Sequence, residues 1–236
     1  MPIPRGAAVG EELNHRFTAM TEPTETARPI SRSSTLSAVR TTYRARTATV
    51  SEDKAIVTNP EIHRLADLYH LEGYLFQQVS ARFAKEQTLT PFDFFAVIIW
   101  KSNRVKTKVK KGLHDAGKTV QSLMHDLVVA RRPEDKVEVL TQIDGIGIRV
   151  ASAVLAVCYP SQFTVLDYRA WDTLSRCKVD GLPGSIPSTP AAYILYCEAC
   201  IDLADRQGIS LRDLDRALWA RSWEHDLKHL IEGMEA

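Results

Sequence analysis

The stretch Val139–Asp167, which reads VLTQIDGIGIRVASAVLAVCYPSQFTVLD, decides how this chain is interpreted. Helical patterns of apolar residues lie on both sides of Ile143–Gly147, so the chain must reverse its direction there within about four residues. Glycine adopts a positive φ without steric cost, and two glycines around one apolar residue suit such a turn. The sequence therefore predicts a helical hairpin in which Ile146 fills the seam between the two helices.

The two glycines of this hairpin, Gly145 and Gly147, also leave backbone N–H groups uncovered at the start of the second helix. Such donors, together with the positive end of the helix dipole, bind phosphate groups without regard to base sequence. A plain turn between two helices uses the same residue types. The hairpin alone therefore leaves both interpretations open.

The hairpin and the residues after it resemble one family. Over Ile143–Asp167 the chain is similar to the helix-hairpin-helix DNA glycosylase superfamily, the class of endonuclease III and oxoguanine glycosylase. Residues 143–147 resemble the family's Leu-Pro-Gly-Val-Gly, Val150 and Ala151 match the pair that usually follows, and the family's aspartate falls on Asp167. The resemblance implies an all-α helical bundle that binds double-stranded DNA. It also implies a catalytic role for Asp167, which suits the N-cap of the helix it opens as well.

The same resemblance assigns further roles. It places the residue that fills the gap left by an everted base at Asn103, although Ser102 and Asn103 equally suit a simple break between two helices. An extruded base needs aromatic stacking partners, and aromatic residues near the motifs are the candidates, although most aromatic side chains belong to cores. The candidates for the base pocket are Trp100, Tyr168 and Trp171.

One position departs from the family pattern. Bifunctional members carry a lysine two residues after the second hairpin glycine, and Arg149 stands there in this chain. A guanidinium stays protonated and cannot form a Schiff base, so we expect Arg149 to contact phosphate and the chain to act as a monofunctional glycosylase. A bifunctional glycosylase/lyase would need a different amine, such as that of Lys101.

The formal net charge is only +1, but the positive charges are concentrated in the middle of the chain. Residues 101–132 carry nine Lys or Arg and two Asp or Glu, whereas residues 133–236 carry ten and sixteen. Local potential sets the affinity for a polyanion, so we expect a DNA-contacting face here, with a solvated basic helix as the alternative. The expected DNA-binding residues are Lys101, Arg104, Lys106 and Lys108, followed by Lys110 and Lys111, together with Gly145, Ile146, Gly147 and Arg149 of the hairpin.

Proline and capping patterns predict an all-α fold from about residue 59 onward. Residues 1–55 are rich in Thr, Ser, Arg and Pro and are expected to form a flexible or partly ordered arm, with a strand over 41–50 as an option. Residues 56–236 are expected to form the glycosylase-like domain, with the hairpin at 134–158. The expected helices cover 60–84, a segment from Pro91 onward, 118–131, 133–142, 148–158, 167–177, 190–206 and 210–231.

Composition excludes several classes of protein. No apolar run reaches the roughly 18 residues that span a bilayer, and the N-terminus lacks the apolar core of a signal peptide, so we expect a cytoplasmic, DNA-associated monomer without a membrane partner. The cysteines have neither the number of a disulfide framework nor the spacing of an iron–sulfur cluster, and we expect Cys197 and Cys200 to pack in the core. No cofactor is therefore required, although the hairpin leaves room for a monovalent cation. The four cysteines are Cys158, Cys177, Cys197 and Cys200.

Together these patterns predict a monofunctional DNA glycosylase that flips out a modified or damaged base, hydrolyses its N-glycosidic bond and leaves an abasic site. The chain resembles small bacterial members of the superfamily, some of them suspected of antiviral defence against phages, so glucosylated hydroxymethylcytosine is one expected substrate. An oxidised or alkylated base, as in ordinary DNA repair, is the other. A non-catalytic helix-hairpin-helix DNA-binding protein is the alternative that requires no chemistry at Asp167.

Overall fold

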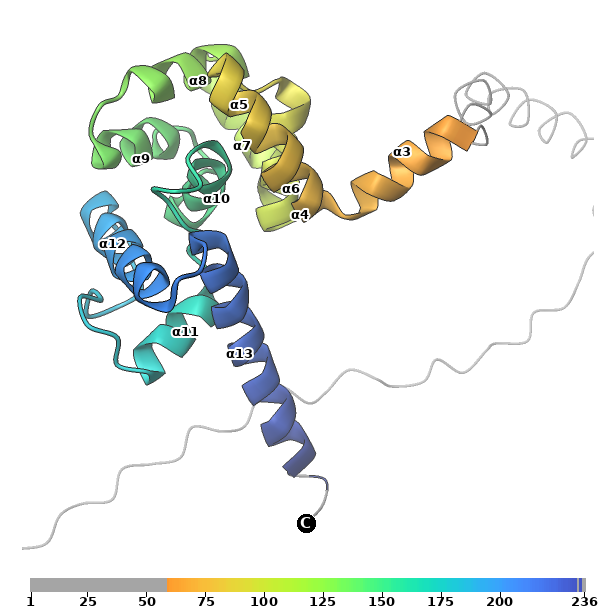
Figure 1. Cartoon of the computed structure of the whole chain (residues 1–236). Helices are drawn as coiled ribbons and strands as arrows, with labels where there is room; N and C mark the ends of the chain where they lie inside the picture. Colours follow the sequence, from red (N-terminus) through yellow and green to blue (C-terminus); the bar gives the residue numbers. More distant parts are fainter. Residues whose placement is uncertain (1–58, 233, 235–236) are drawn as a thin grey trace, which may run out of the picture. The chain divides into compact units, whose positions relative to one another are not determined.

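A computed structural model describes residues 59–232 and 234, and within these residues the chain forms helices and no strands (Figure 1). The all-α prediction is confirmed for this part of the chain. The chain divides into the units Met1–Ile56 and Val57–Ala236, and the arm expected over 1–55, with its optional strand, lies outside the described residues. The elements are α3 (Asn59–Tyr69), α4 (Leu71–Gly73), the π-helical turn η2 (Tyr74–Val79), α5 (Ser80–Glu86), α6 (Pro91–Ser102), the 3-10 turn η3 (Asn103–Val105), α7 (Lys106–Asp115), α8 (Val120–Val129), α9 (Pro133–Thr141), α10 (Ile148–Cys158), α11 (Tyr168–Arg176), α12 (Pro190–Gln207) and α13 (Leu211–Glu232).

Local signals determine where most of these helices begin and end. The Thr90 side chain caps α6 by accepting a hydrogen bond from the backbone N–H of Asp93 at 3.1 Å, and Gly208 ends α12 in the left-handed region with φ 63°. The predicted helix 148–158 matches α10 at both ends, and the other predictions from residue 118 onward agree within two residues. Three helices begin with a proline, whose missing N–H costs nothing there: Pro91 in α6, Pro133 in α9 and Pro190 in α12.

The single helix predicted over 60–84 is wrong, because the chain is interrupted at His70, between α3 and α4. The predicted apolar spacing is present in both halves, but only the second half is buried. Leu75 and Phe83 are fully buried in the core, whereas Tyr69 at the end of α3 is 85% exposed. Tertiary packing therefore holds the segment after the break and does not hold α3, which periodicity alone could not distinguish.

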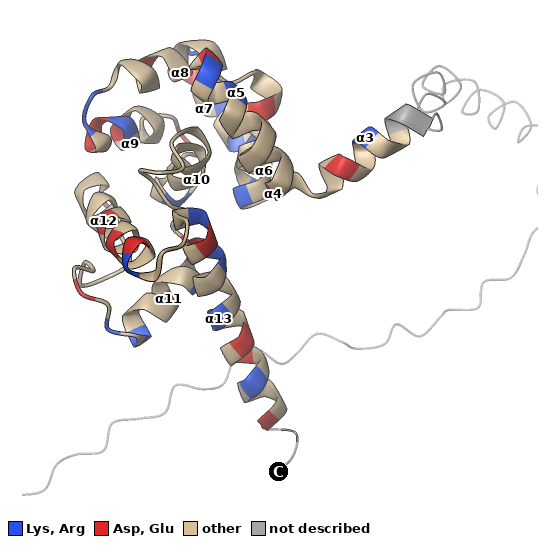
Figure 2. Ribbon diagram, in the orientation of Figure 1, with Lys and Arg blue, Asp and Glu red and all other residues tan. Residues whose placement is uncertain are grey.

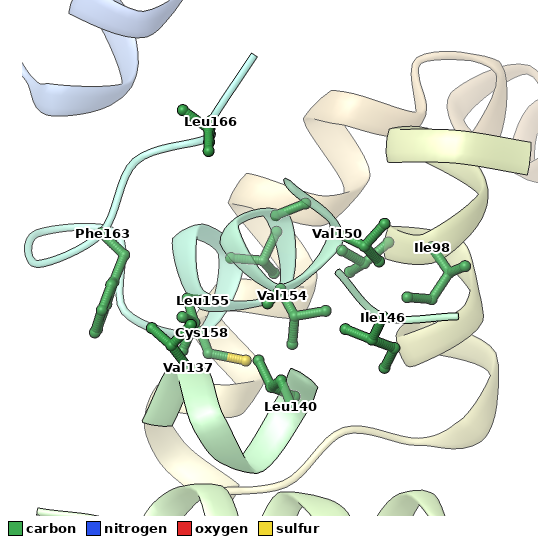
Figure 3. Close-up of a cluster of buried hydrophobic side chains, with 14 of the residues drawn as sticks. Ile98, Val137, Leu140, Ile146, Val150, Val154, Leu155, Cys158, Phe163 and Leu166 are labelled. Atoms are coloured by element: carbon green, nitrogen blue, oxygen red, sulfur yellow. The ribbon is translucent and has the colours of Figure 1, made fainter. Parts of the chain in front are cut away.

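The hairpin predicted over 134–158 is present as α9, a turn and α10. The ribbon of α10 is mostly tan in Figure 2, because Arg149 is its one charged residue, and every residue from Val150 to Cys158 is buried. Ile146 of the turn is 3% exposed and packs in the core, as predicted. Figure 3 shows Ile146 on the same side of this cluster as Ile98 of α6, so the turn and α6 both contribute side chains to one core.

The turn is also in close backbone contact with α7. Gly145 has φ +92°, and a Cβ atom there would lie 2.8 Å from the backbone nitrogen of Val109. A Cβ atom on Gly112 of α7 would lie 2.3 Å from the carbonyl oxygen of Asp144. Gly147 is different, since its φ is −83° and a Cβ atom would meet nothing within 4 Å. The fold therefore requires glycine at positions 112 and 145, but not at 147.

Candidate active-site pocket

Asp167 stands at the N-cap of α11, at the end of the extended segment that follows α10. Its Oδ1 atom accepts a hydrogen bond from the backbone N–H of Arg169 at 3.0 Å, so the predicted capping role is confirmed. Its Oδ2 atom lies 3.1 Å from the Nζ atom of Lys101, and 33% of the side chain is exposed. The carboxylate is thus held on two sides and remains accessible to a ligand.

Side chains from two helices fix the backbone next to Asp167. Ser152 of α10 accepts a hydrogen bond from the backbone N–H of Leu166 at 2.9 Å and donates its own to the carbonyl oxygen of Arg149 at 2.8 Å. Lys101 of α6 donates to the carbonyl oxygen of Leu166 at 3.0 Å. Because buried backbone groups need partners, these bonds hold the segment in one conformation. Sequence inspection did not single out Ser152, since a serine inside a helix carries no distinctive signal.

Two tyrosines of α12 hold the same segment further upstream. Tyr193 donates its hydroxyl group to the carbonyl oxygen of Thr164 at 2.8 Å, and Tyr196 donates to that of Val165 at 3.4 Å. Both tyrosines are fully buried. The extended segment therefore satisfies its polar backbone with side chains rather than with a neighbouring strand.

The charges around Asp167 keep it ionised. Burial acts to raise its pKa, but the ammonium group of Lys101, the hydrogen bond from Arg169 N–H and the charge of Arg149 outweigh burial, so the pKa lies below the ordinary value of 3.8. Arg149 is itself exposed. Asp167 is consequently a carboxylate throughout the neutral pH range.

Asp167 lies on the wall of a pocket of about 390 Å³. This volume falls within the range of about 300–1,000 Å³ typical of small-molecule sites. The wall combines two indole rings with three acidic and three basic side chains from α4, α6, α13 and the segment before α11. The lining residues are Glu72, Trp100, Lys101, Val165, Asp167, Arg212, Asp215, Arg216 and Trp219.

Arg212 organises one side of this pocket. Its guanidinium lies over the rings of Phe76 and Trp100, with 4.3 and 5.2 Å between the guanidinium carbon and the ring centroids. It forms ion pairs with Glu72, at 3.0 Å, and with Asp215. One arginine thus connects an aromatic wall to two carboxylates.

Asp215 is the second carboxylate of the pocket, and its side chain is only 7% exposed. Burial raises its pKa from 3.8 to about 6, against the positive charges of Arg212 and Lys101 and with the added effect of the negative charge of Asp167. Asp215 therefore binds a proton far more readily than Asp167 does.

The structure brings together only part of the predicted base pocket. Trp100 lines the pocket beside Asp167. Tyr168 is 62% exposed, and Trp171 packs against Tyr196 with 6.2 Å between ring centroids; neither lines the pocket. Trp219 of α13 lies on the wall instead and was not expected from the sequence.

A helical pattern in the sequence could have indicated the pocket residues on α13 that were not predicted. Four pocket residues of α13 follow the spacing i, i+3, i+4 and i+7, which places them on one face of the helix. This face adjoins the buried apolar face of the same helix. The four residues are Arg212, Asp215, Arg216 and Trp219.

The predicted DNA-binding residues lie in two settings. Lys101 is only 11% exposed and belongs to the pocket rather than to the basic surface. Arg104, Lys106, Lys108 and Lys110 are exposed. Lys106 donates a hydrogen bond of 2.7 Å to the side chain of Asn103. Asn103 is the residue predicted to fill the gap left by an everted base.

The basic surface adjoins the hairpin. Lys108 pairs with Asp144 of the turn at 2.9 Å, and both side chains are more than half exposed. Lys111 pairs with Asp115 on its own helix at 2.7 Å. Exposed pairs of this kind are weak, so phosphate groups can compete for these lysines.

Cys158, Cys197 and Cys200 are buried, in agreement with the predicted core packing of the last two, and Cys177 is exposed. Among residues 59–232, no group of three or more His, Cys, Asp or Glu side chains is arranged to hold a metal ion. The described helices include none that is long and apolar enough to cross a membrane.

Comparison of the chain with protein-family models, with curated proteins and with solved structures gives no significant match.

Proposed function

We propose that this chain is a DNA glycosylase that receives an everted modified base in the pocket and hydrolyses its N-glycosidic bond. The observation that carries the proposal is the setting of Asp167: an ionised carboxylate, held by two hydrogen bonds, on the wall of a pocket that also offers the indole rings of Trp100 and Trp219. Extruded bases are bound by stacking and by hydrogen bonds to their edges, and this wall supplies groups for both.

The reaction requires a fixed negative charge. As the base departs, positive charge develops on the sugar, as it does in glycoside hydrolysis. A carboxylate that is already in place stabilises this charge without reorganisation and can orient the water that attacks C1′. Lys101 and the backbone N–H of Arg169 favour the ionised form of Asp167, so its charge is available at neutral pH.

The surface near the hairpin supports binding to duplex DNA. The first N–H groups of α10 follow Gly147, which has no side chain to cover them, and exposed lysines of α7 lie beside the turn. Helix N-termini and lysines are the groups that bind phosphates regardless of sequence. The proposed DNA contacts are therefore those of Arg104, Lys106, Lys108, Arg149 and the hairpin backbone.

The Asp167→Asn variant tests the catalytic assignment. Asparagine caps a helix as well as aspartate does, so the fold is retained while the charge is lost. We expect base release, measured as alkali-labile sites in DNA, to fall by at least about 100-fold. Equal formation of abasic sites by the wild type and the variant would refute the role of Asp167.

A bifunctional glycosylase/lyase is the second candidate, favoured by the amine of Lys101, 3.1 Å from Asp167 in the pocket. This route requires the ammonium group of Lys101 to pass a proton to Asp167. The free amine would then bond to C1′ as the bond from C1′ to the base breaks, and cleavage of the C1′–O4′ bond would leave an imine on the opened sugar. Borohydride reduces such an imine to a stable protein–DNA adduct. An adduct that disappears in Lys101→Gln would establish this candidate, and base release without an adduct would exclude it.

Substrate choice is tested with a panel of unmodified, damaged and phage-modified DNAs, including glucosylated hydroxymethylcytosine, by mass spectrometry of released bases. Binding of wild-type protein to every DNA without release from any of them would refute the glycosylase proposal. That result would identify a non-catalytic DNA-binding protein.

A further inference from the structure

Two carboxylates share the pocket, but their environments are opposite. Asp167 is one-third exposed and takes hydrogen bonds from Lys101 and from the backbone N–H of Arg169. Asp215 is almost fully buried, and within the described part of the chain Arg212 is the one group that hydrogen-bonds to its carboxylate. The negative charge of Asp167 is thus well compensated by its partners, whereas that of Asp215 is poorly compensated.

The groups that face Asp215 explain its high proton affinity. Burial is the largest influence, and it favours the neutral acid. Positive charges come from Arg212 on its own helix and Lys101 on α6, while negative charges come from Asp167 and Glu72. On the α12 side, Tyr196 and Cys200 carry no charge at neutral pH, because burial raises the pKa of both.

Arg212 does not fully offset the negative charge of Asp215. Its guanidinium is shared with Glu72, at 3.0 Å, and lies over the ring of Phe76. A pair of acids whose surroundings separate their proton affinities is the arrangement that assigns one to donate a proton and the other to remain charged.

We propose that Asp215 is the acid that protonates the departing base, and that the pocket therefore takes bases that are uncharged in DNA. This inference rests on the glycosylase function proposed above. In this scheme Asp167 faces the sugar and stabilises its positive charge, and Asp215 faces the base and protonates it.

Atoms and electrons balance in this step. The bond between C1′ and the base nitrogen breaks, its electron pair stays on the base, and a nitrogen or carbonyl oxygen of the base takes the proton of Asp215. Water adds to the oxocarbenium ion at C1′ and loses a proton to Asp167 or to solvent, and Asp215 regains a proton from solvent. One water molecule is consumed for each abasic sugar and neutral base formed.

The same acid defines the class of substrate. A purine alkylated at N7, such as 7-methylguanine, is already cationic in DNA and leaves as a neutral molecule without an acid. An uncharged base leaves as an anion unless it is protonated. The pocket also disfavours a cation, because with Asp215 protonated its positive side chains outnumber its negative ones: Lys101, Arg212 and Arg216 against Glu72 and Asp167.

The test is single-turnover base release between pH 5 and 8 from duplexes that carry one modified base. The probes are 8-oxoguanine, hydroxymethylcytosine and its glucosylated form, with 7-methylguanine as the charged comparison. For the uncharged base that the wild type releases fastest, we expect a rate that is constant below about pH 6 and falls about tenfold per pH unit above it. Asp215→Asn should release that base at least about 100-fold more slowly at pH 5.5, with a flat pH profile.

Two further variants separate chemistry from folding. Asp215→Glu retains an acid and should recover part of the rate and its fall with rising pH. Glu224→Gln removes a carboxylate from an exposed position of the same helix, where its partners Arg221 and Lys228 lie outside the pocket, and should leave the rate unchanged. Thermal melting checks the fold of each protein, and if Asp215→Asn does not fold, the wild-type and Asp215→Glu profiles decide.

Each outcome is decisive. A flat wild-type profile, an unchanged profile in Asp215→Asn, or faster release of 7-methylguanine than of any uncharged base would overturn the role of Asp215 while leaving the glycosylase assignment intact. No base release by the wild type from any probe would overturn both proposals.

Discussion

A Cβ atom at Gly145 or at Gly147 would have different consequences, because only Gly145 is enclosed by the fold. Gly145→Ala combines a positive φ with a 2.8 Å approach to the backbone of Val109, so we expect it to lower the free energy of unfolding by about 2 kcal/mol or more. Gly147→Ser places a good N-cap residue at an open position, and we expect the free energy of unfolding to change by less than about 0.5 kcal/mol.

This difference isolates the contribution of the hairpin to DNA binding. If the N–H groups after Gly147 contact a phosphate, Gly147→Ser obstructs that contact and should weaken binding by about tenfold, the equivalent of roughly 1.4 kcal/mol. Denaturation and DNA titration measure the two effects separately. Normal DNA affinity in a normally folded Gly147→Ser would show that the turn does not contact DNA.

Ser152 supports Asp167 through Leu166, the residue that precedes Asp167, because it accepts the hydrogen bond of the Leu166 backbone N–H. Ser152→Ala would leave the buried N–H of Leu166 without a partner, which should cost about 1–3 kcal/mol of stability and slow base release. Thr141→Ala is the matched control, because the carbonyl groups that Thr141 contacts belong to its own helix, and its cost should stay below about 1 kcal/mol. Equal losses in the two variants, measured by denaturant unfolding, would contradict this account of Ser152.

At the scale of whole elements, capping and apolar spacing predict most helices because these signals act within one turn. Thr90 and Gly208 determine their helix ends through neighbouring atoms alone. The interruption at His70 could not be predicted in this way, since α3 and the segment after it carry the same apolar spacing and differ only in tertiary burial.

The basic face of α7 is the element that should respond to salt. Replacing Lys106, Lys108 and Lys110 by Ala should weaken binding to all DNA sequences and reduce the salt slope by about 0.9 for each phosphate group that is no longer neutralised. Affinities measured at several salt concentrations check this. Lys228→Ala on α13, where Lys228 pairs with Glu224 at 2.8 Å, is the single-lysine control. An unchanged slope in the triple variant would assign the α7 lysines to a solvated surface.

At the scale of the molecule, the pocket joins residues that are far apart in the chain. The motif around the hairpin identifies Asp167, but nothing local relates it to Glu72 of α4 or Asp215 of α13. Lys101 was expected on the DNA surface, because its neighbours in sequence are basic. Its place beside Asp167 follows from the packing of α6 against α10, which sequence spacing does not show.

The two carboxylates of the pocket should also affect the pH dependence of stability in opposite directions. The pKa of Asp215 is raised in the folded protein from 3.8 to about 6, so its stabilising contribution is complete below pH 3.8 and is lost as pH rises through 6. The pKa of Asp167 is lowered, so its contribution is present above pH 3.8 and is lost as pH falls through the folded value.

Asp215→Asn removes the first of these effects. Between pH 3.8 and 7 the wild type should lose about 3 kcal/mol through Asp215, on the basis of 1.36 kcal/mol per pKa unit, and the variant should not. Relative to the wild type, the variant should therefore become more stable as pH rises, whereas Asp167→Asn should become less stable. Urea unfolding at pH 4 and pH 7 measures both differences without DNA. Parallel pH dependence in the wild type and Asp215→Asn would show that folding does not raise the pKa of Asp215 and would remove the buried acid from the proposed chemistry.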